Sequence, residues 1–382
     1  MRVLLERNDV DPNIADEDGQ TPLSRAAESG HEGIVRVLLE RNDVDPNITN
    51  ENSGTPLFWA VSRGDEEVVR KLLERSDVDP DLAHRFGQTP LSLAIESGYE
   101  EVVRMLLERK DINPNTVNQD GRTPLSLAIG GVNEEVVRML LERNDINPNT
   151  ADRDSRTPLS LAAEYEYEGT VRVLLERNDV DPNLADKFGQ SPLSLAAESG
   201  HEGVVRTLLE RNDINPNTAD RDSRTPLSLA AEYEYEGVVR ILLERNDVDP
   251  NLADRFGQTP LSLAIGSGYE EVVRMLLERN DINPNTVDQD GRTPLSLAIG
   301  GVNEEVVRML LERNDVNLDI SDHDDQTVDW WAAHKVDRIA KLLRGRGDFT
   351  PGYAASPHPI ASCPPKPPPE SSEIPSKRIR RF

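Results

Sequence analysis

Residues able to support catalysis or metal binding are few in this chain and are scattered along it. No two of the six histidines have the H-E-x-x-H spacing that would place both imidazoles on one helix face. Cys363 is the only cysteine, so neither a disulfide framework nor a cysteine–histidine metal site can form. The glycines occur singly at regular turns and form no phosphate-binding loop. We therefore predict no catalytic, cofactor-binding or metal-binding residues and no enzyme activity.

The serine that follows most Pro-Leu pairs could suggest a nucleophile, but it belongs to a repeated motif. Thr-Pro-Leu, once Ser-Pro-Leu, recurs every 34 residues, starting at Thr21, Thr55, Thr89, Thr123, Thr157, Ser191, Thr225, Thr259 and Thr293. A residue copied into almost every unit is structural, because an active site needs an asymmetric set of groups. A strict period of this length is typical of a solenoid.

Each unit predicts two short helices, as repeat 1 (residues 13–46) shows. Thr21 is a good N-cap, Pro22 suits the first helical position, and Gly30 suits the end of the helix. The second helix is expected from about Glu32 to Arg41, with one apolar face made by Ile34, Val35, Leu38 and Leu39. Its Glu and Arg residues at i, i+4 spacing indicate a solvated outer face.

This pattern resembles the ankyrin repeat, D-x-x-G-x-T-P-L-H-x-A-A-x-x-G-H…V-x-x-L-L. The matching residues of repeat 1 are Asp16, Gly19, Thr21-Pro22-Leu23, Ala26-Ala27, Gly30-His31, Val35 and Leu38-Leu39. Two features depart from the family: Ser replaces His after Pro-Leu, and the period exceeds the usual length by one residue. The resemblance spans about residues 1–347 and implies an α-solenoid of about ten stacked helix-turn-helix repeats with projecting hairpin loops.

Four segments are expected along the chain. Residues 1–12 match only the second helix and connector of a repeat, which suggests a fragment or a start codon assigned too late. Residues 13–318 hold nine repeats, and residues 319–346 form a degenerate C-terminal capping repeat. Residues 347–382 are rich in proline and predicted to be disordered, with a polyproline segment that could contact an SH3- or WW-type groove and a basic end, Lys377–Arg381, that could direct nuclear import.

The formal charge of −27 restricts the partners of the array. Such an acidic surface repels nucleic-acid phosphates and anionic membranes, so neither is expected as a ligand. No apolar stretch approaches the ~18 residues of a membrane helix. We expect a cytoplasmic chain, with a nuclear location if the basic end is functional, and a monomer if the array is capped.

The positions where the repeats differ are the candidates for partner binding. Ankyrin ligands usually meet the hairpin tips and the exposed side of the first helix, so the resemblance selects variable residues there. These are Phe86, Phe188 and Phe256 at turns, Arg153, Arg156, Arg221 and Arg224 in two other hairpins, and Trp59, Tyr165 and Tyr233 on or after first helices. Two alternatives stay open: each Phe could pack on its neighbouring hairpin, and the Tyr residues could fill a turn that lacks glycine.

These observations favour a protein-interaction scaffold or adaptor whose partner contacts the hairpin tips and the concave helix face. One alternative is the recognition segment of a larger fungal signalling or immunity-type protein whose effector domain precedes Met1, since near-identical Leu-Leu-Glu-Arg-Asn-Asp copies resemble arrays of filamentous fungi. An adaptor that recruits an enzyme such as a ubiquitin ligase is a third, less favoured reading.

Overall fold

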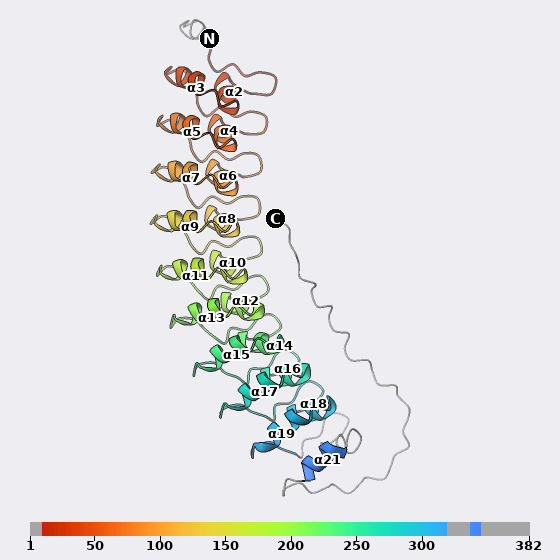
Figure 1. Ribbon diagram of the computed structural model, residues 1–382. Coiled ribbons are helices and arrows are strands. Elements are labelled where there is room, and N and C mark those ends of the chain that lie inside the picture. Colours follow the sequence, from red (N-terminus) through yellow and green to blue (C-terminus); the bar gives the residue numbers. More distant parts are fainter. Residues whose placement is uncertain (1–9, 319–336, 345–382) are drawn as a thin grey trace.

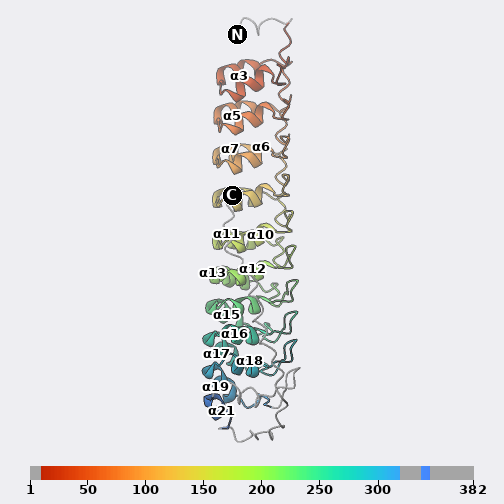
Figure 2. The same ribbon diagram turned by 90° about the vertical axis from the view of Figure 1, so that its right-hand side faces the viewer.

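The computed structural model describes residues 10–318 and 337–344, which form one stack of helix pairs (Figure 1). Three parts of the chain lie outside the described residues: residues 1–9 of the expected partial repeat (1–12), residues 319–336 and 345–346 of the expected capping repeat (319–346), and the whole expected tail (347–382). Figure 2 shows the loops as a separate column along one edge of the stack. The described part of the chain contains helices and turns but no β-strand.

Every repeat contributes a first helix that begins at the proline of the repeated tripeptide. These helices are α2 (Pro22–Glu28), α4 (Pro56–Ser62), α6 (Pro90–Glu96), α8 (Pro124–Gly130), α10 (Pro158–Glu164), α12 (Pro192–Ser199), α14 (Pro226–Glu232), α16 (Pro260–Ser267) and α18 (Pro294–Gly300). In α2 the predicted N-cap is confirmed, because Thr21 Oγ1 accepts the backbone N–H of Ser24. Ser replaces the family's His without loss here, since in α10 the Ser160 hydroxyl also accepts the backbone N–H of Thr157.

The second helices run antiparallel to the first and are equally regular. They are α3 (Glu32–Leu39), α5 (Glu66–Leu73), α7 (Glu100–Leu107), α9 (Glu134–Leu141), α11 (Glu168–Leu175), α13 (Glu202–Leu209), α15 (Glu236–Leu243), α17 (Glu270–Leu277) and α19 (Glu304–Glu312). Helix α3 ends two residues before the predicted Arg41. The backbone N–H of Arg41 turns back to Leu38, so its side chain belongs to the connector.

The core is a thin layer between the two columns of helices. Each first helix contacts the first helix of the next repeat, and each second helix does the same. Leu57, Leu91 and Leu125 are completely buried at equivalent positions, and small residues such as Ala60 and Ala94 allow close approach of the columns. Helix α21 (Asp337–Arg344) extends the stack, because it contacts α19 and buries Ile339 and Leu343.

An arginine series joins consecutive connectors: Arg41, Arg75, Arg109, Arg143, Arg177, Arg211, Arg245, Arg279 and Arg313. Arg177 is representative. Its guanidinium pairs with Asp179 at 2.7 Å and donates to the carbonyls of Leu141 and Arg143 in the preceding repeat, at 2.8 and 3.1 Å. The carbonyl of Leu141 lies at the end of α9, where no intrahelical partner is available. The repeated Arg-x-Asp therefore caps the helix of one repeat from the connector of the next.

An asparagine series joins the same connectors: Asn13, Asn47, Asn115, Asn149, Asn183, Asn217, Asn251 and Asn285. Asn47 donates from Nδ2 to the carbonyl of Asp77 at 2.7 Å and accepts the N–H of Asp79 at 2.8 Å. In repeat 3 (residues 81–114) this position is Asp81, which accepts the N–H of Asn113 but has no amide to donate. The connector that makes this period longer than usual is thus held by side chains across each repeat boundary.

Candidate functional site

The hairpin tips form a regular row along one edge of the stack. Within a tip, the N–H of Gly189 bonds to the carbonyl of Asp186, and Gly189 has a left-handed φ of 82°. Between tips, the backbone N–H of Lys187 donates to the carbonyl of Asp154, and the backbone N–H of Arg221 donates to the carbonyl of Phe188, both at 2.9 Å. Because each tip is bonded to its neighbours, side chains on the tips keep a fixed spacing.

The three predicted phenylalanines are exposed on these tips. Phe86, Phe188 and Phe256 keep 50%, 55% and 45% of their surface accessible, so they do not bury themselves on the adjacent hairpin. The preceding residue places a cation over each ring: Arg85 at 4.6 Å, Lys187 at 5.0 Å and Arg255 at 4.6 Å from the ring centre. Each of these tips therefore holds an aromatic ring and a cation together. Lys187 and Arg255 also pair with Asp154 and Asp222 of the preceding tips, at 2.6 and 2.7 Å.

The four predicted arginines divide into two kinds. Arg153 and Arg221 are exposed on the tips, and their guanidinium groups make no ion pair or hydrogen bond with the described residues. Arg156 is buried instead, and bonds to Asp152 at 3.0 Å and to Glu164 at 3.4 Å. Arg224 makes the equivalent pairs with Asp220 and Glu232 at 2.9 and 3.5 Å. The second pair of arginines is thus occupied by carboxylates of its own repeat.

The remaining predicted residues lie on or after first helices. Trp59 is half-buried against Gly54, meets Phe58 edge-on at 5.7 Å between ring centres, and its Nε1 has no hydrogen-bond partner. Tyr165 and Tyr233 follow α10 and α14. Each lies beside a second tyrosine, Tyr167 and Tyr235 respectively, with ring centres 6.0 and 6.1 Å apart. Tyr165 packs against the core, whereas Tyr233 is exposed. The tyrosines are therefore not equivalent despite their identical surroundings in the sequence.

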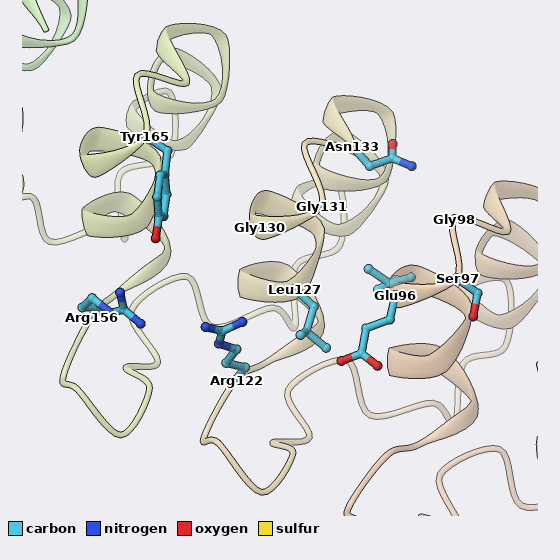
Figure 3. A pocket seen from close by; sticks show the side chains of 11 residues that line it. Glu96, Ser97, Gly98, Arg122, Leu127, Gly130, Gly131, Asn133, Arg156 and Tyr165 are labelled. Carbon is cyan, nitrogen blue, oxygen red and sulfur yellow. The ribbon is translucent and has the colours of Figure 1, made fainter. Parts of the chain in front are cut away.

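A groove that the sequence did not single out lies between α6, α8 and α10 (Figure 3). It has a volume of about 730 Å³, and Glu96, Arg122, Leu127, Arg156 and Tyr165 line it. The glycine pair at the end of α8, Gly130-Gly131, leaves one wall without side chains. The sequence shows that these two glycines are adjacent, but it does not show that Arg122 lines the same groove.

The described residues contain no group of three or more His, Cys, Asp or Glu side chains placed to hold a metal ion. None of the described helices is long and apolar enough to cross a membrane.

Comparison with known families agrees with this geometry. A family model described as ankyrin repeats (3 copies) matches residues 42–118, 110–186, 177–254 and 243–324. A second, described as ankyrin repeats (many copies), matches residues 4–60. The chain belongs to the ankyrin repeat family. Among curated proteins, no sequence matched this ankyrin chain.

A solved structure supports the same assignment. The ankyrin repeat domain of Bcl-3, described in its title as a unique member of the IkappaB protein family, is 30% identical to this chain. The match covers 59% of this chain and 100% of that domain, with a TM-score of 0.53. Family and structure together identify an ankyrin array, that is, a protein-interaction repeat domain.

Proposed function

We propose that this ankyrin array is a non-catalytic scaffold or adaptor that binds a protein partner through its hairpin tips and concave helix face. The observation that supports this best is the set of three exposed phenylalanines, each beneath a cation. Large apolar rings left in water are unfavourable unless a partner covers them, and aromatic and arginine side chains dominate interface energetics.

The spacing of the three rings favours a large or extended partner. They belong to repeats 3, 6 and 8, and at about 10 Å per helix layer they span about 50 Å. Arg153 and Arg221 lie on tips between them and have no carboxylate partner among the described residues. A partner that follows the row of tips would meet aromatic and basic contacts on an otherwise acidic protein.

The test replaces Phe86, Phe188 and Phe256 by Ser in the full chain. Binding to a partner first identified by affinity capture and then purified should weaken by about tenfold or more, as the loss of ~1.4 kcal/mol would require. Helical content and melting should change little, because the tips contribute little to the core.

A matched control replaces Arg138, Arg172 and Arg206 by Ser on the outer face of second helices. All three are exposed, so this variant changes the same number of surface residues far from the tips. Unchanged affinity of the Phe variant, or an equal loss in the control, would contradict the proposal and direct attention to Trp59, Tyr165 and Tyr233.

A further inference from the structure

In most repeats, the residue before the tripeptide is bonded to the residue eight positions later. Gln20 donates to Glu28 at 2.8 Å and Gln190 donates to Glu198 at 2.5 Å. Arg156 pairs with Glu164 at 3.4 Å in the same arrangement. In repeats 5, 7 and 9 an arginine occupies this position, and an aspartate four residues earlier binds it, as Asp152 does at 3.0 Å.

Arg122 occupies this position in repeat 4 but lacks both partners. The residue eight positions later is Gly130, and the residue four positions earlier is Asn118. Asn118 Oδ1 accepts two backbone N–H groups, from Asp120 and Arg122, and carries no charge. The Arg122 guanidinium makes no hydrogen bond or ion pair with any described residue. The Arg122 charge does act on Glu96 of the preceding repeat, where it opposes the rise that burial gives the pKa of that carboxyl, but no carboxylate of its own repeat is bonded to it.

Arg122 lines the groove shown in Figure 3, as does Glu96, which accepts a hydrogen bond from Gln88. A Cβ atom built on Gly130 would meet nothing within 4 Å, so the space that a glutamate fills in other repeats is open. Leu127 and Glu96 line the groove on the side of α6 and α8. The groove thus combines a cation, an apolar contact and a separate carboxylate within about 730 Å³.

A second copy of this block in the same chain shows what the groove has gained. Residues 86–147 and 256–317 differ at four positions: Glu96/Gly266, Lys110/Asn280, Asn118/Asp288 and Ile146/Val316. Two of the four change the charges around Arg122. In the second copy, Asp288 pairs with Arg292 at 2.9 Å. The first copy alone combines an arginine that has no hydrogen-bonded carboxylate with a glutamate in the same groove.

We infer that this groove binds the side-chain carboxylate of an Asp or Glu in an extended segment of a protein partner. The carboxylate takes the place of the missing glutamate and forms charge-assisted hydrogen bonds with Arg122. Because the array as a whole repels anions, the segment is neutral or basic overall, and a Lys or Arg next to its acidic residue pairs with Glu96. The inference rests on the proposed function, since it specifies one contact of the partner.

The test uses a library of random 12-residue peptides displayed internally on phage and selected on the full chain. Enriched peptides should share one acidic residue beside a basic one. In fluorescence anisotropy, an enriched peptide should lose about tenfold or more in affinity for Arg122→Gln, as expected for a hydrogen bond to a charged group. Gly130→Glu should cause a similar loss, because it restores the internal partner, and Asn118→Asp should weaken binding in the same direction.

Gly266→Glu is the matched control. It adds the same side chain at the equivalent position of repeat 8, where a Cβ atom also meets nothing within 4 Å. The residue eight positions earlier, which corresponds to Arg122, is Gln258 there. Its affinity should equal that of the unaltered chain. Changing the acidic residue of the peptide to its amide should abolish the effect of Arg122→Gln, which a general loss of stability would not do.

Several results would overturn the inference. Enriched peptides without an acidic residue, or equal binding to Arg122→Gln, would remove the carboxylate site while leaving the tips, and thus the proposed function, intact. Binding that depends on a free peptide C-terminus and disappears on amidation would assign the site to a chain end instead. If no peptide is enriched, the groove is not a peptide site; the proposed function fails separately only if the Phe variant also retains full affinity for its protein partner.

Discussion

Asp81 differs from the other members of the asparagine series because a carboxylate cannot donate a hydrogen bond. Burial raises the pKa of Asp81, and the charges of Asp79 and Asp111 act in the same direction, against the bond from the Asn113 N–H. Since its folded-state pKa lies above the unfolded value of about 3.9, folding favours the protonated form. The ionised Asp81 carboxylate therefore lowers the stability of the fold. This loss of stability is absent below the unfolded-state pKa and complete above the folded-state pKa.

We therefore predict that Asp81→Asn stabilises the array by about 1 kcal/mol at pH 7, the usual net value of one hydrogen bond after solvent screening. The gain should shrink as the pH falls through the folded-state pKa of Asp81 and should be lost below about pH 4, because the wild-type carboxyl is then neutral in the folded protein. Urea unfolding of the wild-type protein and of Asp81→Asn, at pH 7 and below about pH 4, measures the difference in unfolding free energy between them.

Asp79→Asn is the control for Asp81→Asn. It removes the same charge two residues away, at a position where Asn113 stands in the next repeat. A gain for Asp79→Asn as large as that for Asp81→Asn would show that net charge, not the missing donor, sets the stability.

At the scale of the element, the arginine series makes each second helix depend on the following repeat. Arg177→Met keeps a long apolar chain but removes the bonds to the carbonyls of Leu141 and Arg143 and the pair with Asp179. We expect a loss of about 1–3 kcal/mol at this repeat boundary, the cost of leaving such polar groups unsatisfied.

The control for Arg177→Met is Arg172→Met, five residues earlier. Its exposed pair with Glu168 should contribute at most about 1 kcal/mol. Hydrogen exchange of the amides at the end of α9 measures the effect of each change. Equal protection of those amides in the two variants would show that the arginine series does not cap the preceding helix.

The helices were predictable because their signals are local: a Thr-Pro start, an apolar face and a terminal glycine lie within a few residues. The arginine series was not, since Arg177 and the carbonyl of Leu141 are 36 residues apart. The tips were predictable as variable positions, but Arg153 and Arg156 look alike in sequence, and only the fold shows that one is exposed and the other is bound to Asp152. Recognising Arg122 required knowing that residues 118 and 130 would lie beside it, because a carboxylate is missing from both positions.

At the scale of the whole molecule, each repeat contacts only its neighbours, so damage should remain local. Leu140 lies in α9 with no accessible surface, and Leu140→Ala should cost about 2–4 kcal/mol through the cavity that it leaves. Hydrogen-exchange mass spectrometry should show lost protection in the repeats around α9 while the last repeats keep theirs.

Arg138→Ala, on the exposed face of the same helix, provides the control for Leu140→Ala. It should leave the exchange pattern unchanged, because no cavity forms. A single cooperative transition in Leu140→Ala, with protection lost equally along the chain, would show that the array behaves as one folding unit.

The arginine series also has a genetic consequence. Among the described residues, each boundary from Arg75 to Arg313 is closed by the same side chain, which reaches carbonyls 34 or 36 residues upstream whichever repeat supplies them. Unequal recombination that adds or deletes whole repeats would create new boundaries with all of these bonds restored. Alleles of different length could therefore fold equally well, while the order of aromatic tips and the neighbours of Arg122 would change, so partner choice could diversify without loss of the scaffold.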